Sequence, residues 1–79
     1  MEQQVEIRKN ITQFKSRVKE ICVLIAEARR ASGQTQKDAA EWVGVSLRTY
    51  FMLEKGICTI ELLCDVSDKF DIQINLNYN

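Results

Sequence analysis

The chain holds few of the residues that carry out chemistry in enzymes. Histidine is absent, and no serine or cysteine stands beside a plausible base, so nucleophilic and acid–base catalysis have no visible apparatus. Cys22, Cys58 and Cys64 form no CxxC pair, whereas a zinc site needs four ligands at short paired spacings. We therefore expect no enzyme activity, no metal and no cofactor. The thiols should be reduced, with Cys22 and Cys64 in apolar packing.

Size and charge predict one small domain with two unlike ends. The 79 residues are too few for two independent cores, and the absence of proline favours helices. Formal net charge is zero, but residues 1–55 hold ten Lys/Arg against seven Asp/Glu, and residues 56–79 hold one against four. This imbalance fits a footprint for a polyanion, and an acidic surface helix would produce it equally well. With no signal peptide and no apolar run of membrane-spanning length, we expect a cytoplasmic protein without a membrane partner.

The first third of the sequence carries two competing patterns. Val5 and Ile7 alternate with charged neighbours, which indicates a short strand. A longer series steps by four and three, as in an amphipathic helix: Ile7, Ile11, Phe14, Val18, Ile21 and Ile25. We expect helix from about Thr12 to Ser32, ended by Gly33, and leave residues 3–9 open. The basic residues of this part indicate either a solvated face or a track along phosphates: Arg8, Lys9, Lys15, Arg17 and Lys19.

Hydroxyl residues and glycines divide the middle of the chain into short helices. Thr35, with Asp38 three residues on, resembles a capping box and predicts a helix that Gly44 ends. Ser46 predicts a second helix that stops at Gly56. A fourth helix is expected from Thr59 to about residue 70, with one apolar face made by Ile60, Leu63, Val66 and Phe70.

The end of the chain alternates strictly between apolar and polar residues, which predicts a half-buried strand. Its apolar positions are Ile72, Ile74, Leu76 and Tyr78. A lone strand leaves its backbone donors and acceptors unpaired, so it needs a partner. The chain offers residues 3–8 or the same tail of a second subunit. We expect pairing between two tails across a two-fold axis, which makes a homodimer.

Two short helices joined by a turn that contains glycine are the outline of a DNA-reading helix-turn-helix. In such a hairpin Ala40 must be small where the helices cross, and Gly44 must allow a left-handed turn. Val45 should fill the angle between the helices, and Tyr50 and Leu53 should point into the core.

The chain resembles the Cro/C1-type (xenobiotic-response-element) helix-turn-helix family over about residues 21–70. The resemblance rests on the order Thr35-Gln36, Ala39-Ala40, Gly44-Val45-Ser46, Thr49, Leu53 and Glu54-Lys55-Gly56, with Ile25, Arg29 and Gly33 before it. The alternating tail further resembles HipB-like antitoxins, whose C-terminal strands pair between subunits. The implied fold is mainly α, with four or five helices and one C-terminal strand. Residues 1–16 would be an N-terminal extension, 17–70 the DNA-binding domain, and 71–79 the dimerisation strand.

The resemblance assigns roles to single positions. It implies DNA contact for Gln36, Lys37, Ser46, Leu47, Arg48, Thr49 and Met52. Arg48 is the candidate for direct readout, because a guanidinium can grip guanine O6 and N7 together. Lys37 would add charge near the phosphates without reading sequence. Arg29 and Glu54 match a largely buried ion pair, which we interpret as structural.

Leu47, Phe51 and Met52 depart from the family pattern, because together they would make an apolar patch on a helix meant for water or DNA. They could read thymine methyl groups, be partly buried against the N-terminal extension or the fourth helix, or bind another protein. Trp42 is expected to pack on a helix surface or in the core rather than stack on a ligand.

The sequence thus predicts a dimeric transcriptional regulator of bacterial or phage origin, associated with the nucleoid when bound. It would be a repressor that binds double-stranded DNA at an inverted repeat. The alternative is an antitoxin or a protein-binding adaptor whose main partner is a toxin or another protein.

Overall fold

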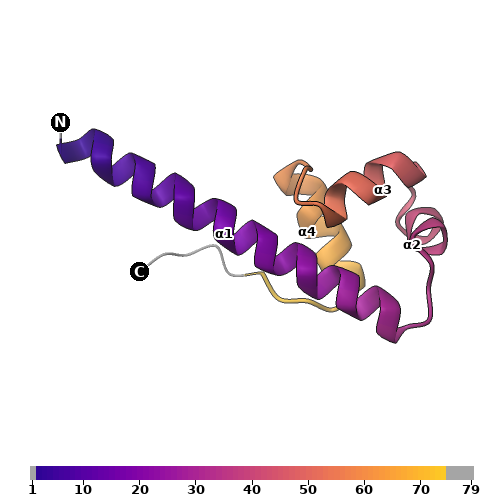
Figure 1. Ribbon diagram of the computed structural model, residues 1–79. Helices are drawn as coiled ribbons and strands as arrows, with labels where there is room; N and C mark the ends of the chain where they lie inside the picture. Colours follow the sequence, from indigo (N-terminus) through magenta and orange to yellow (C-terminus); the bar gives the residue numbers. More distant parts are fainter. Residues whose placement is uncertain (1, 75–79) are drawn as a thin grey trace.

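The computed structural model describes residues 2–74, with side chains from Thr12 onward, and it is mainly helical. Four helices follow in chain order: α1 (Glu2–Ala31), α2 (Gln36–Val43), α3 (Leu47–Glu54) and α4 (Ile60–Lys69). α1 runs the length of the molecule and the three shorter helices gather on its C-terminal half (Figure 1). None of the helices within residues 2–74 is long and apolar enough to cross a bilayer.

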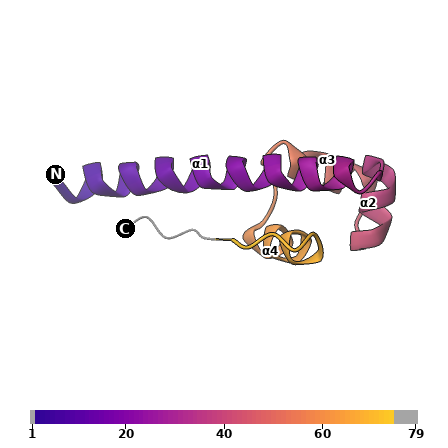
Figure 2. The same cartoon turned by 90° about the horizontal axis from the view of Figure 1, so that it is seen from below.

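α1 settles the open question about the first residues in favour of helix. It spans 30 residues, about 45 Å at 1.5 Å per residue, and the boundary expected between residues 16 and 17 falls inside it. Seen from below, its N-terminal half extends past the other helices (Figure 2). At its C-terminal end, Gly33 adopts φ +73°, and the amide of Gln34 donates to the carbonyl of Arg29 at 3.1 Å. This is the left-handed cap expected at Gly33.

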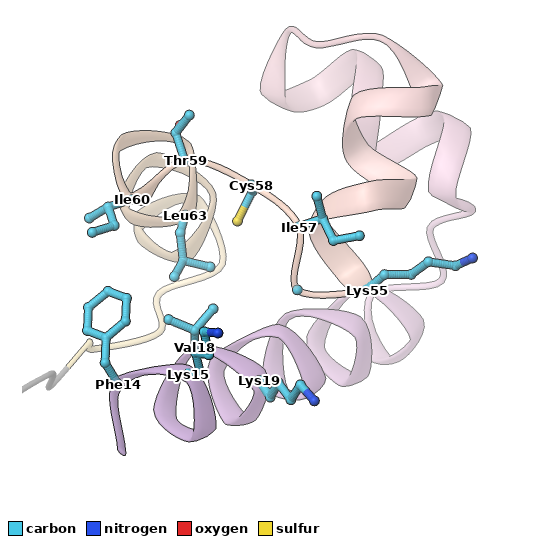
Figure 3. A pocket seen from close by; sticks show the side chains of 11 residues that line it. Phe14, Lys15, Val18, Lys19, Lys55, Ile57, Cys58, Thr59, Ile60 and Leu63 are labelled. Carbon is cyan, nitrogen blue, oxygen red and sulfur yellow. The ribbon is translucent and has the colours of Figure 1, made fainter. Parts of the chain in front are cut away.

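The core lies where the four helices meet. Its buried side chains are Ile21, Cys22, Ile25, Ala39, Ala40, Tyr50, Leu53, Leu63 and Val66. The predictions for Tyr50, Leu53, Leu63 and Val66 are thus confirmed, whereas Ile60 is 50% exposed and does not join the core face of α4. Ile60 is the first residue of α4, and its side chain projects from the side of the helix away from Cys58 (Figure 3).

The expected C-terminal strand is not confirmed. Residues 72–74 have no regular secondary structure, and the part of the chain that the structure describes contains no strand. Ile72 and Ile74 are half-buried and pack against the core of their own chain, while Leu76 and Tyr78 lie outside the described residues.

Candidate nucleic-acid interface

α2 begins with the capping box that Thr35 and Asp38 predict. The amide of Asp38 donates to Thr35 Oγ1 at 3.0 Å, and the amide of Thr35 donates to Asp38 Oδ2 at 3.0 Å. These hydrogen bonds, the backbone one above all, lower the pKa of Asp38. The start of α2 is therefore held firmly, with Gln36 and Lys37 in its first turn.

A three-residue turn, Gly44 to Ser46, joins α2 to α3. Gly44 adopts φ +91°, and the amides of Gly44 and Val45 both donate to the carbonyl of Ala40, at 2.9 and 3.0 Å. Ala40 is 2% exposed, and Val45 is half-buried against the core. Glycine is needed at this point because an L side chain is strained at such a φ.

α3 begins with a pair of hydroxyl groups that hydrogen-bond one another. Ser46 Oγ accepts from the amide of Thr49 at 3.1 Å and donates to Thr49 Oγ1 at 2.8 Å. The hydroxyl proton of Thr49 is thereby directed to other acceptors. The first turn of α3 carries no acidic residue, and Arg48 is exposed beside this pair. Together, the helix N-terminus, the hydroxyl proton and the guanidinium attract an anionic oxygen.

The apolar residues of α3 split between exposed and partly covered positions. Leu47 and Phe51 are 50% and 41% exposed, and Met52 is half-buried. Burial against the N-terminal helix or α4 is therefore wrong for Leu47 and Phe51. Phe51 instead carries Lys55, whose Nζ lies 4.4 Å from the ring centroid in a cation–π contact. Thymine contact and protein contact remain open for the patch.

An ion pair holds the interface helices together behind this surface. Arg29 Nε donates to Glu54 Oε2 at 2.6 Å, Nη2 donates to Oε1 at 3.3 Å, and Nη1 donates to the carbonyl of Gln34 at 2.9 Å. Gln36 Nε2 also donates to Glu54 Oε1, at 3.1 Å, a contact that sequence reasoning missed. The side chains of Arg29 and Glu54 are 11% and 7% exposed. Their hydrogen bonds connect α1 with α2, with α3 and with the loop before α2.

The network also determines the charge state of the pair. Burial raises the pKa of Glu54, but hydrogen bonds from Arg29 and Gln36 outweigh it and hold the pKa below its ordinary value. The hydrogen bond to Glu54 raises the pKa of Arg29. Below the pair, burial and the Glu54 carboxylate raise the pKa of Tyr50. Both members of the ion pair are therefore charged at neutral pH.

Two acidic residues lie near the α2–α3 turn, where they would repel phosphate. A hollow between the α2–α3 turn and α4 is lined by Val43, Gly44, Val45, Leu62, Asp65, Asp68 and Lys69. Asp65 and Asp68 contribute two carboxylates to this lining. These carboxylates would repel a polyanion at this hollow.

Two cysteines and Trp42 lie outside the candidate interface. Cys64 is exposed on α4, so its expected apolar packing is wrong, whereas Cys22 is buried as expected. Trp42, 44% exposed, packs edge-to-face on Phe70 with ring centroids 5.0 Å apart, as expected of a packing residue. The described part of the chain brings together no group of three or more residues able to hold a metal ion.

Comparison with models of protein families, with characterised proteins and with solved structures finds no match.

Proposed function

We propose that the chain is a sequence-specific regulator that binds double-stranded DNA as a dimer and represses transcription from an inverted-repeat operator. The observation that carries the proposal is the open side of α3. Leu47, Arg48 and Thr49 are exposed on a helix that a tight turn holds against α2. A helix with one free face of this size fits the major groove of B-DNA.

The side chains of this face would contact different groups of the DNA. Arg48 would bind guanine O6 and N7, and Ser46, Thr49 and the N-terminus of α3 would bind a phosphate. Lys37 would contribute charge at the backbone. Gln36 uses one amide hydrogen for Glu54, which leaves its second amide hydrogen and its carbonyl for a phosphate or base edge.

Dimerisation through the tail belongs to the same proposal. The residues that would pair between subunits are Ile72, Ile74, Leu76 and Tyr78. Ile72 and Ile74 are only half-buried on their own chain, so part of each side chain can contact a partner. Two α3 helices would then enter successive major grooves, about 34 Å apart. The protein would act in the cytoplasm, on the nucleoid.

Binding to duplexes selected from a random pool tests the proposal, measured by fluorescence anisotropy over a range of salt concentrations. Arg48→Ala should cost about 1–3 kcal/mol, roughly 5- to 150-fold in affinity, and relax the preference at one base pair. Lys69→Ala, which removes an exposed charge from α4, is the matched control and should leave affinity nearly unchanged. Equal loss on every sequence would assign Arg48 to phosphate. Failure to select any duplex, or affinity independent of salt, would refute DNA binding.

The second candidate, an antitoxin or adaptor that binds a toxin or another protein, is favoured by the exposed Leu47 and Phe51 and by the zero net charge. A protein partner would cover this patch. In that case Phe51→Ser should weaken the complex with the product of a neighbouring toxin gene at least tenfold. The same substitution should leave Arg48-dependent DNA affinity in place.

A further inference from the structure

An apolar groove lies between α1 and the segment that leads from α3 into α4, at the opposite end of α3 from Arg48. It encloses about 290 Å³. Phe14 and Val18 of α1 face Leu63 and Ile60 of α4 across it, and the sulfur of Cys58 points inward from the loop (Figure 3). Although Leu63 is buried, Ile57 and Ile60 at the edges are 59% and 50% exposed. The groove therefore presents apolar surface to water with part of its lining uncovered.

The rim of this groove is positively charged. Lys15 and Lys19 of α1 and Lys55 at the end of α3 contribute to its lining, and the described residues of the lining include no aspartate or glutamate. All three are exposed, and none makes an ion pair with a residue whose side chain the structure describes. Their aliphatic stems border the groove (Figure 3), but the Nζ of Lys55 is turned away from it and lies over the Phe51 ring. An occupant should thus combine an apolar body with a negative end.

We propose that the groove binds a free medium-chain fatty acid, with its chain on Phe14, Val18 and Leu63 and its carboxylate beside Lys15 and Lys19. An apolar cavity of about 150 Å³ accommodates a benzene ring, so this groove has room for an alkyl chain. Among the residues of α1 whose side chains the structure describes, those that border the groove run from Phe14 to Lys19, roughly 8 Å. A second copy related by a two-fold axis would set lysines against lysines.

Calorimetric titration of the full chain with octanoate, nonanoate and decanoate, below micelle-forming concentrations, tests the proposal. Each added methylene should tighten binding about fourfold until the groove is filled, because each buries one more CH₂. Decanol should bind at least fivefold more weakly than decanoate, and decyltrimethylammonium should not bind. Equal affinity for decanol and decanoate, or no dependence on chain length, would overturn the proposal.

Three variants locate the site. Ile60→Gln, in the groove, should weaken decanoate binding at least tenfold. Leu24→Gln, at a residue of α1 that is 47% exposed against 50% for Ile60 and does not line the groove, should leave binding unchanged. The double variant Lys15→Gln/Lys19→Gln should bind decanoate and decanol alike. Equal losses in Ile60→Gln and Leu24→Gln would mean adventitious association only. A wild-type dimer that Ile60→Gln dissociates in sedimentation experiments would assign the groove to a second copy.

Discussion

Glu54 connects the helices of the proposed interface more directly than any other described side chain. Its two oxygens accept hydrogen bonds from Arg29 of α1 and Gln36 of α2, while its backbone belongs to α3. A buried ion pair of this kind fixes geometry more than it adds net stability, but removal of one partner leaves the other uncompensated. The orientation of α3 therefore depends on the charge of a single carboxylate.

Neutralisation of this carboxylate should destabilise the fold in a way that depends on pH. Because hydrogen bonds lower the pKa of Glu54 in the folded chain, its contribution is fully present above the unfolded pKa, about 4.3, and is lost as pH falls through the folded value. Glu54→Gln should cost about 2 kcal/mol at pH 7 and flatten the decline of stability below pH 5. Urea unfolding between pH 3 and pH 7 measures both effects.

The control for this experiment is Glu27→Gln, at an exposed position of α1. It should leave the unfolding midpoint within about 0.5 kcal/mol of the wild type. If Glu54→Gln kept the full acid sensitivity of the wild type, the carboxylate would not be responsible for it. Asp38, whose pKa is also lowered, accounts for a remaining slope.

At the scale of elements, α2 and α4 end in the same backbone conformation with different residues. Gly44 follows α2 at φ +91°, and Asp71 follows α4 at φ +58°. At Asp71 the amide of Ile72 donates to the carbonyl of Ser67 at 2.8 Å, the pattern of a left-handed cap that glycine usually occupies. Asp71 also places a negative charge at the negative end of the helix. The end of α4 is therefore suboptimal, while the end of α2 is not.

Opposite substitutions at these two caps should have opposite effects. Gly44→Ala should destabilise by about 1 kcal/mol, because no atom within 4 Å would obstruct the new Cβ and only the positive φ is unfavourable. Asp71→Gly should stabilise by about 0.5–1 kcal/mol, because it relieves φ strain and removes the charge. The midpoint temperature of thermal unfolding should change by roughly 4–8 °C for each kcal/mol of stability. A lower midpoint for Asp71→Gly would contradict this account of the α4 cap.

The sequence predicted the helix boundaries correctly in the C-terminal two thirds of the chain, because local hydrogen bonds determine where a helix begins. Thr35, Ser46 and Thr59 each accept a hydrogen bond from the amide three residues on, as a hydroxyl at an N-cap does. The burial of single side chains was harder to predict from the sequence. Ile60 and Cys64 share the apolar character of Leu63, but whether each lies under α1 depends on how α4 crosses it, which periodicity does not specify.

The whole molecule is asymmetric, because α1 is far longer than the domain that it supports. The described core begins near Val18 and Ile21, so the first third of α1 contributes no described core contact. The groove between α1 and α4 could not be predicted from the sequence. Its walls come from α1, the α3–α4 loop and α4, and their approach is a product of packing between segments distant in the chain.

Truncation should separate the two parts of α1. Removal of residues 1–12 should keep the fold cooperative, with a midpoint within a few degrees of the full chain, because every side chain that the structure describes as buried remains. Removal of residues 1–22 should abolish cooperative unfolding, because it deletes Ile21 and Cys22 from the core. Calorimetry and circular dichroism of both truncations measure this. Loss of the transition in the shorter truncation would show that the domain needs the extended part of the helix.

The three thiols of the molecule differ sharply in their surroundings, and this has a practical consequence. Burial raises the pKa of Cys22 to about 11 and also raises the pKa of Cys58, whereas Cys64 stands exposed on α4. Electrophiles react with the thiolate form, so a maleimide or nitroxide reagent would modify Cys64 first. The protein thus carries its own attachment point for a spectroscopic probe, placed on a different helix from Arg48, from which separations between subunits or to an end-labelled oligonucleotide can be measured without introducing a cysteine.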